Sequence, residues 1–217
     1  MLTTSPAADT RERLLHAAME VFAEHGFEAA TIREICRRAD ANVAAVHYHF
    51  GDKKRLYAAI FDNVFTLLRE RRTSFLPADA PPQERLRIYI RALFEEIFCG
   101  DGDERRCTQL SAIYLMEMAR PTEVLDRVVT DHMRQDAEEL YNIVGALLGE
   151  ASTKDKAIDC SASVVGQILY YYQAEPIISR LHPDRPPVTQ RIDDLVDHVW
   201  RFSLGGIGRH RDGRKPT

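Results

Sequence analysis

The stretch NVAAVHYHFGDKK, residues 42–54, contains the signals that decide the fold of the N-terminal region. Asn42 is a residue type that begins helices, because its side-chain oxygen accepts a hydrogen bond from a free backbone N–H of the first turn. Gly51 and Asp52 break the helix that starts there, and Asp52 caps a further helix. The sequence therefore predicts a short helix with small residues at its start and a His-Tyr-His run at its end.

Two more helices are predicted before this stretch. Asp9 with Glu12, and Thr31 with Glu34, match the capping box, in which two side chains satisfy backbone N–H groups at a helix start. The first of these helices has one apolar face and is expected to end at Gly26. Apolar residues at helical spacing define that face: Leu14, Leu15, Ala18, Val21 and Phe22.

Two short helices joined by a tight turn, with a third helix beside them, are typical of a helix-turn-helix. The second short helix of such a unit, the recognition helix, lies in the major groove of DNA. Small side chains at Ala44 and Ala45 allow the helix backbone to approach base edges closely. We expect Val46 and Phe50 to face the core, whereas so short a helix leaves the direction of Val43 undecided.

The donors available for phosphate contacts are few. His47, Tyr48 and His49 can donate to flanking phosphates, which fix the position of a protein on DNA without specifying sequence. Lys53 begins the next helix, where free N–H groups and the helix dipole favour an anion. Residues 1–55 contain eight Lys and Arg against eight Asp and Glu. Any DNA contact must therefore come from a few placed donors rather than from a broad basic surface.

The rest of the chain also carries helical patterns. The helix after Asp52 is expected to end near Thr73, before the proline-rich segment FLPADAPPQ. Further helices are predicted near residues 83–99, 108–119, 122–148, 155–180 and 189–204, and strand signals are absent. We therefore predict an all-α fold, in which a three-helix helix-turn-helix head precedes a larger C-terminal helical bundle that dimerises. The predicted domains are 1–55 for DNA binding, 56–80 as connecting helix and hinge, and 81–217 for ligand binding and dimerisation.

Composition agrees with a folded cytoplasmic protein. Hydrophobic residues make up 45% of the 217 residues, which is enough for a packed core, and the net charge is −4. No apolar run approaches the roughly 20 residues needed to span a bilayer, and the N-terminus lacks the pattern of a secretory signal. The four cysteines are too few and too scattered for a disulfide scaffold.

Residues 10–61, TRERLLHAAMEVFAEHGFEAATIREICRRADANVAAVHYHFGDKKRLYAAIF, resemble the DNA-binding head of the TetR family of bacterial transcriptional regulators. The F-x-x-x-G-F turn, the T-x-R-x-I start and the Y-x-F-G-x-K close occur in order at the family's spacings. The resemblance implies a homodimer that binds a double-stranded DNA operator. It also implies that a small-molecule effector, bound in the C-terminal bundle, moves the two heads and weakens operator binding.

The resemblance assigns DNA-binding roles to particular positions. Thr31 and Arg33 match contacts from the first short helix. The positions that match base contacts are Asn42, Val43, Ala44 and Ala45, and those that match phosphate contacts are His47, His49 and Lys53. Asp40 stands where the family usually has glycine, and aspartate tolerates the left-handed conformation of such a turn at some cost. A tyrosine is common in the family where His47 stands, so this contact differs here.

The segments SVVGQILYYYQAEPIISRL (163–181) and DHVWRFSLGGI (197–207) resemble the closing helices of the CecR-like subgroup. The resemblance implies that these helices pair across a two-fold axis. Two apolar stripes fit such an interface: Val165, Ile168, Leu169 and Tyr172, and Ile192, Leu195, Val199 and Phe202. Two heads are then expected about 34–36 Å apart, one turn of DNA, on a near-palindromic site.

Other functional assignments have plain structural alternatives. Helical bundles place ligand pockets between helices, and a subset of the apolar and polar residues could line one: Phe94, Phe98, Gln109, Tyr114, Met118, His132 and Tyr171. Most of these are expected to be core residues. Cys99 and Cys107 could form a redox switch, but intracellular cysteines are more often inert packing residues.

No cofactor or metal site is predicted. His47 and His49 stand two residues apart on a helix and point in different directions, which does not suit a shared ion. The acidic segment 101–105 lacks calcium-loop spacing. The alternative to a regulator is a helical-bundle enzyme or small-molecule carrier, but no nucleophile-and-base set or glycine-rich phosphate loop is present. We therefore expect a ligand-responsive transcriptional regulator, with repression as the family default, and no enzyme activity.

Overall fold

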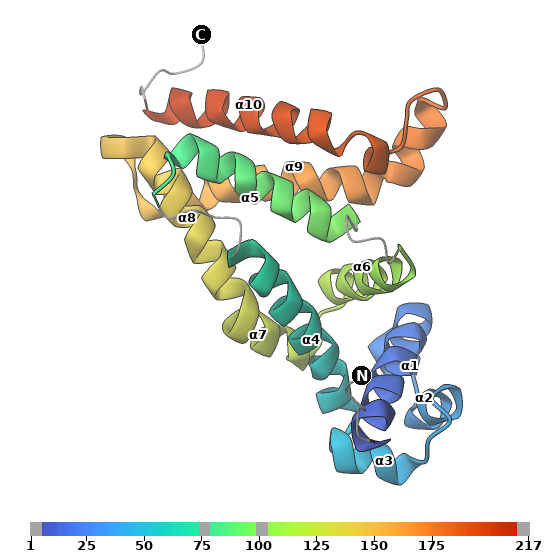
Figure 1. Cartoon of the computed structure of the whole chain (residues 1–217). Coiled ribbons are helices and arrows are strands. Elements are labelled where there is room, and N and C mark those ends of the chain that lie inside the picture. Colours follow the sequence, from blue (N-terminus) through green and yellow to red (C-terminus); the bar gives the residue numbers. More distant parts are fainter. Residues whose placement is uncertain (1–5, 74–78, 99–103, 212–217) are drawn as a thin grey trace. The chain divides into compact units, whose positions relative to one another are not determined.

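The computed structural model of the chain describes the backbone of residues 6–73, 79–98 and 104–211, and the side chains of residues 9–63, 65–66, 79–98 and 108–211. Every regular element in these ranges is a helix, which confirms the all-α prediction (Figure 1). The N-terminal helices are α1 (Pro6–Ala29), α2 (Ile32–Arg38), α3 (Val43–His49) and α4 (Lys53–Thr73). The later helices are α5 (Pro82–Phe98), α6 (Glu104–Ala119), α7 (Glu123–Val128), α8 (Arg134–Leu148), α9 (Lys154–Leu181) and α10 (Ile192–Arg211).

The chain divides into two compact units. The first contains residues 1–67 and 103–133, and therefore α1 to α3, most of α4, α6 and α7. The second contains residues 68–102 and 134–217, with α5, α8, α9 and α10. The predicted functional boundaries near residues 55 and 80 concern roles rather than packing, and they stay a prediction.

Three local signals act as the sequence indicates. The backbone N–H of Glu34 donates to Thr31 Oγ1 at 3.2 Å, and that of Ala45 donates to Asn42 Oδ1 at 2.8 Å. The N–H of Arg55 donates to Asp52 Oδ1 at 2.8 Å. These bonds satisfy free donors at the starts of α2, α3 and α4, and each such cap typically stabilises a helix by ~1 kcal/mol.

Two positions in this region adopt a left-handed backbone. Gly26 has a φ of 72° and interrupts the helical geometry of α1, as expected from a residue without Cβ. Asp40 has a φ of 47°, which turns the chain from α2 into α3. The predicted start of α1 is wrong, however: the helix begins at Pro6, and Asp9 lies within its first turn. Proline suits a first helical position because it has no N–H to satisfy.

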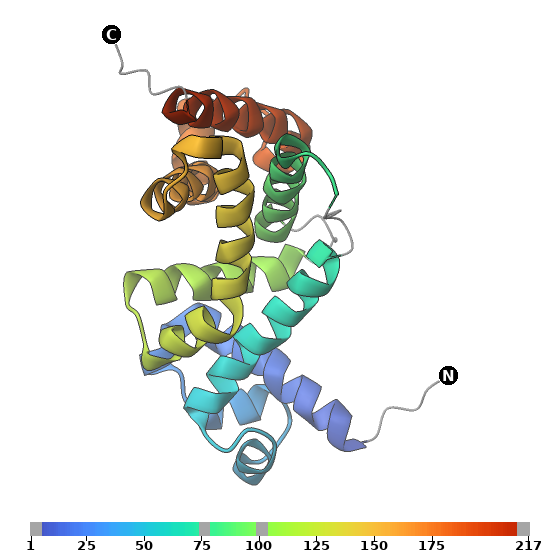
Figure 2. The same cartoon turned by 90° about the vertical axis from the view of Figure 1, so that its left-hand side faces the viewer.

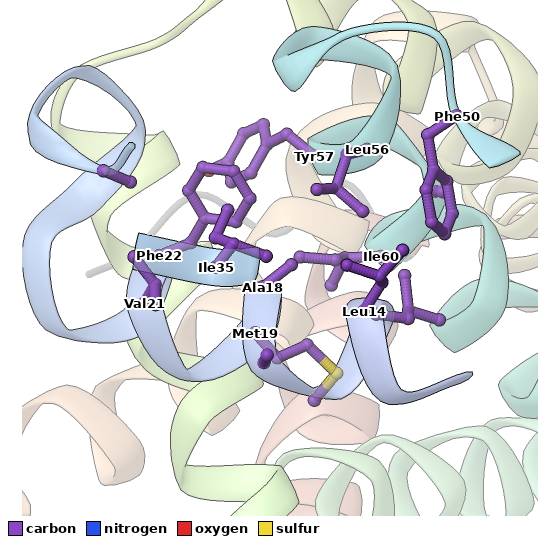
Figure 3. Close-up of a cluster of buried hydrophobic side chains, with 14 of the residues drawn as sticks. Leu14, Ala18, Met19, Val21, Phe22, Ile35, Phe50, Leu56, Tyr57 and Ile60 are labelled. Carbon is purple, nitrogen blue, oxygen red and sulfur yellow. The ribbon is translucent and has the colours of Figure 1, made fainter. Parts of the chain in front are cut away.

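The core of the first unit joins its N-terminal helices (Figure 3). Leu14, Phe22, Ile35, Leu56 and Ile60 are all 0% exposed and come from α1, α2 and α4. Burying each such side chain contributes roughly 1.5–3 kcal/mol. The Phe22 ring also meets the Tyr57 ring edge to face, with centroids 4.8 Å apart. This core fixes the direction in which α3 presents its outer side.

The second unit packs α5, α8, α9 and α10 around a separate core (Figure 2). Leu86, Phe94, Ile143, Val196 and Val199 are completely buried in it. Around the core, polar contacts hold α10 to α5: the Trp200 Nε1–H donates to the Gln83 carbonyl at 2.8 Å, and Arg87 pairs with Asp197 at 2.6 Å. None of the helices in the described ranges is long and apolar enough to cross a membrane.

The predicted helix at 122–148 is divided. A π-helical turn, Val129–Met133, separates α7 from α8 and coincides with the division between the units. Val124 and Val128 belong to the first core, whereas Leu140 and Val144 belong to the second. The wider turn inserts a residue and changes the phase of the side chains. Val129 is 39% exposed, so it does not continue the apolar stripe that the sequence pattern suggests.

Candidate nucleic-acid interface

Helix α3 has a buried side and an exposed side. Val46 is 0% exposed and Phe50, which follows the helix, is 8% exposed, so the prediction that both face the core is confirmed. Val43 and Ala44 are exposed, whereas Ala45 is half-buried and packs against the core. Of the two alanines predicted to face bases, Ala44 is therefore the more accessible, and the role of both stays a prediction. Asn42 is exposed and uses its side-chain oxygen as the cap.

The rings at the end of α3 differ in their surroundings. Tyr48 is 82% exposed and meets the half-buried His49 edge to face, with centroids 4.9 Å apart. His47 is exposed, and its Nδ1 lies 2.6 Å from the Gly51 carbonyl oxygen, to which it donates in the Nδ1–H tautomer. In that tautomer the outward Nε2 must take up a proton before it can donate to a phosphate.

The start of α2 also presents groups to solvent. Thr31 caps the helix with its oxygen, which leaves its O–H as a donor. Arg33 is exposed, and no described carboxylate lies within ion-pair distance of it. Both residues therefore have donors available for the DNA contacts that the resemblance implies.

Lys53 begins α4 as predicted, and it also makes two contacts within the protein. Its Nζ donates to the Glu28 carbonyl at 3.1 Å and lies 4.7 Å from the centroid of the Phe27 ring. These contacts connect the start of α4 to the end of α1 and occupy part of the ammonium group. Because the two partners stand 25 and 26 positions earlier in the chain, local sequence patterns could not reveal them.

Most other cations of this region are held by carboxylates. Glu34 pairs with Arg37 at 2.6 Å and with Arg38 at 2.9 Å, and Arg38 also pairs with Glu24 at 2.6 Å. Hydrogen bonds from Arg37 and Arg38 lower the pKa of Glu34 to about 2. The Glu34 carboxylate therefore accepts hydrogen bonds from Arg37 and Arg38. In the predicted capping box it would instead accept from the Thr31 N–H.

A buried carboxylate that the sequence analysis missed lies in the same unit. Glu117 of α6 is 2% exposed, and it accepts from Tyr57 O–H at 2.9 Å and from the Thr122 N–H and hydroxyl at 2.7 and 2.9 Å. Burial, together with Glu117, raises the pKa of Tyr57 well above its usual range. The only signal was one acid within the apolar segment YLMEMA, residues 114–119.

These groups are among the residues that line a groove of about 700 Å³ within the first unit. Its walls come from the end of α1, the start of α4 and the α6–α7 connection, and they include Phe27, Met116 and Arg120. No group of His, Cys, Asp or Glu side chains that could hold a metal is present among the described residues.

The predicted ligand-binding residues of the first unit have mixed surroundings. His132 donates from Nε2 to Asp62 at 2.8 Å and stacks on Phe65, whose ring centroid is 5.2 Å away. His132 Nδ1 and Gln109 Oε1 are buried without a hydrogen-bond partner. Burial raises the pKa of Tyr114. Met118 is 51% exposed, so it does not line an enclosed pocket.

The remaining predicted ligand-binding residues belong to the second unit. Phe94 is 0% exposed and lies 6.0 Å from Phe98 and 6.1 Å from Tyr171, measured between ring centroids. The three rings pack against the core of that unit. Cys99 lies outside the described residues, as do the side chain of Cys107 and most of the acidic segment 101–105.

The predicted dimer interface requires correction. Ile168, Leu195 and Val199 are at most 2% exposed because the core of their own unit covers them, so they are not available to a second chain. Val165, Leu169, Tyr172 and Ile192 are half-buried. Phe202 is 66% exposed, and α9 adds three exposed apolar side chains that the prediction omitted: Tyr170, Ile177 and Leu181.

Two family models match this chain, one in its N-terminal part and one in its C-terminal part. The family described as bacterial regulatory proteins, tetR family, matches residues 14–60, which contain α2 and α3. The C-terminal domain of the HTH-type transcriptional dual regulator CecR matches residues 82–207.

Individual proteins are similar over different lengths. The HTH-type transcriptional repressor Rv3405c of Mycobacterium tuberculosis is 38% identical over 48% of this chain, and the match spans 62% of that relative's length. The HTH-type transcriptional repressor BepR of Brucella suis is 30% identical over 77% of this chain and 78% of its own. The structure of AibR with isovaleryl coenzyme A and operator DNA shares the fold with a TM-score of 0.66, at 18% identity over 88% of this chain and 98% of AibR.

Proposed function

The chain belongs to the TetR family of bacterial regulatory proteins, with a C-terminal domain of the CecR type, and from this premise we propose that it is a dimeric repressor released from its operator by a small molecule. It acts in the cytoplasm, where the chromosome is, and it carries out no catalysis. The observation that carries the proposal is the two-sided form of α3: Val46 and Phe50 anchor the helix, and Val43, Ala44 and Tyr48 are presented to solvent.

The exposed side of α3 enters the major groove. Ala44 allows a close approach to base edges, and Val43 offers an apolar surface to thymine methyl groups. Tyr48 and protonated His47 donate to phosphates beside the groove, and Thr31 and Arg33 do so from α2. Asn42 keeps its amide nitrogen as a donor, because the cap uses only the oxygen.

Dimerisation uses the exposed apolar side chains of α9 and α10. Tyr170, Ile177 and Leu181 stand seven and four residues apart, so they share one side of α9. These three side chains and Phe202 of α10 are large apolar groups exposed to solvent, and a second copy of the chain would cover them. Replacing Ile177 and Leu181 by Glu should convert the dimer to a monomer in sedimentation experiments and weaken operator binding. If the double variant stays dimeric, the dimer interface lies elsewhere.

The effector binds within the C-terminal domain of the CecR type, residues 82–207. Gln109 Oε1 and His132 Nδ1 are the polar atoms best placed to receive it, because both are buried without a partner in the described structure. Since His132 Nε2–H is given to Asp62, Nδ1 is an acceptor in the neutral ring. The expected effector therefore has an apolar body and a hydrogen-bond donor. The AibR ligand, isovaleryl coenzyme A, is a suitable first probe for this site.

The test is an electrophoretic mobility shift with the DNA upstream of the gene and with an unrelated duplex, at several salt concentrations. The parent chain should prefer the upstream DNA, and affinity should fall steeply with salt because each phosphate contact adds about 0.9 to the log–log slope. Ala44→Leu should remove the preference for upstream DNA. Ala146→Leu, at an exposed alanine of α8, should preserve it. Absence of any shift would favour the carrier alternative, and equal preference in both variants would exclude α3 as the recognition helix.

A further inference from the structure

The cations around the recognition helix differ in whether a carboxylate neutralises them. Among the eight Lys and Arg of residues 9–55, five pair with carboxylates of the described residues: Arg13, Arg37, Arg38, Lys54 and Arg55. Arg11, Arg33 and Lys53 have no described carboxylate within 4.0 Å. The Lys53 ammonium group donates a hydrogen bond to the Glu28 carbonyl. Arg33 is already proposed to contact a phosphate from α2. Arg11 remains without an assigned role.

Arg11 is held beside the end of α3. It is exposed on α1, and its guanidinium carbon lies 5.2 Å from the centroid of the Phe50 ring. Phe50 is the C-cap of α3, and its N–H donates to the Val46 carbonyl at 2.9 Å. Leu14, one turn after Arg11, is 0% exposed in the core that also contains Phe50 (Figure 3). The core therefore fixes which side of α1 faces α3, and the ring fixes the position of the guanidinium.

This position has a physical consequence for anion binding. The C-terminal end of a helix carries partial negative charge from its free carbonyls, which disfavours a phosphate there. A cation beside the end of α3 offsets that charge. A guanidinium stacked on a ring has already lost part of its rotational freedom, and its planar N–H groups can bind a phosphate with two hydrogen bonds. Arg11 thus has the charge, the geometry and the exposure that a phosphodiester requires.

We infer that Arg11 of α1 contacts a phosphate of duplex DNA beside the C-terminal end of the recognition helix. The inference rests on the proposed function of α3 and extends the DNA-binding surface to α1, which neither the sequence motifs nor the residue correspondences include. The contact is independent of base sequence, because a phosphate carries no sequence information. It positions the end of α3 while Thr31 and Arg33 position the start of α2.

A purely structural role for Arg11 predicts different behaviour. If stacking on Phe50 only stabilises the junction of α1 and α3, then removing the guanidinium lowers the melting temperature and leaves the salt dependence of DNA binding unchanged. If Arg11 binds a phosphate, the salt dependence itself changes, since fewer counterions are released on binding.

The experiment measures dissociation constants over a salt series for the full chain with its upstream DNA and with an unrelated duplex of equal length. Arg11→Gln should raise the dissociation constant severalfold for both duplexes and reduce the log–log salt slope by about 0.9 for each bound head. Arg11→Lys, which keeps the charge, should retain the slope. Arg13→Gln is the matched control, because Arg13 lies on the same helix and already pairs with Asp9 at 3.7 Å.

The outcomes separate this inference from the proposed function. A parent chain without salt-dependent DNA binding contradicts the proposed function, and with it the role of Arg11. A parent that binds, with an Arg11→Gln variant of equal affinity and slope, contradicts the role of Arg11 alone. A lowered melting temperature with an unchanged slope also overturns it and leaves a structural role. Equal losses of slope in Arg11→Gln and Arg13→Gln would show a general charge effect and overturn the specific contact.

Discussion

Helices α2 and α3 are each seven residues long and begin with a side-chain cap, yet they differ in how they use their outer sides. The last turn of α2 carries Arg37 and Arg38, which Glu34 and Glu24 hold in ion pairs. Helix α3 contains no carboxylate, lysine or arginine, and its outermost side chain, Tyr48, is 82% exposed. The comparison indicates that the paired charges of α2 position the helices of this region, whereas the outer side of α3 is uncovered and carries no Lys, Arg, Asp or Glu.

The inner anchors of the two helices should have the largest effect on stability. Ile35 of α2 is 0% exposed, and replacing it by Ala removes methylene groups and leaves a cavity. Such substitutions cost about 2–5 kcal/mol in the free energy of unfolding, which urea titration followed by circular dichroism would measure. The exposed neighbour Arg33→Ala should change it by less than about 0.5 kcal/mol. A loss below about 1 kcal/mol for Ile35→Ala would mean that α2 is not fixed by this core.

A substitution on the outer side of α3 should weaken DNA binding and leave stability unchanged. Tyr48→Phe removes one hydroxyl from an exposed ring and should leave the melting temperature unchanged. Loss of a hydrogen bond to a charged phosphate should raise the dissociation constant for operator DNA about tenfold. Fluorescence anisotropy with labelled upstream DNA measures this change. Unaltered affinity would remove Tyr48 from the phosphate contacts, and unaltered affinity in Tyr48→Ala as well would remove the ring from the interface.

The ion pairs of α2 predict an effect of pH on the stability of the folded chain. Because the pKa of Glu34 is lowered from 4.5 to about 2 in the folded chain, its contribution to stability is present above about pH 4.5 and is lost as the pH falls toward 2. The parent should therefore lose stability in this interval more steeply than Glu34→Gln. Thermal unfolding from pH 6 to pH 2.5 compares the two. Parallel curves would show that Arg37 and Arg38 do not hold this carboxylate in solution.

The turn between the helices should give the smallest change. Asp40 adopts a φ of 47°, which costs a residue with a side chain roughly 1–2 kcal/mol and glycine very little. Asp40→Gly also gains entropy in the unfolded chain, so the net gain in stability should be about 1 kcal/mol or less. Calorimetry should show a small rise in melting temperature with unchanged DNA affinity. A fall in melting temperature would reveal a stabilising role for the Asp40 side chain.

Local signals allowed much of this region to be predicted. Thr31, Asn42 and Asp52 act as caps because a cap depends only on residues within the next turn. Gly26 and Asp40 mark their turns because few residue types adopt a positive φ. The start of α1 was misplaced since Pro6 can begin a helix as well as Asp9 can cap one.

Long-range packing could not be predicted in the same way. The periodicity of Ile168 and Val199 shows that one side of each helix is apolar, but it does not show whether the chain's own core or a second chain covers that side. The contacts of Lys53 with Phe27 and of Glu117 with Tyr57 join residues 26 and 60 positions apart. Such pairs depend on the folded arrangement, and a single sequence carries no signal for them.

The contrast between α2 and α3 can be tested directly by photo-crosslinking to operator DNA. A benzophenone-bearing phenylalanine analogue is placed at Tyr48 in one variant and at Arg37 in another, since both positions are exposed and lie on neighbouring short helices. Irradiation with the upstream duplex should give a protein–DNA adduct from position 48 that unlabelled upstream DNA competes away, and little adduct from position 37. Equal adducts from both positions, or none from position 48, would contradict the assignment of α3 as the helix that contacts DNA.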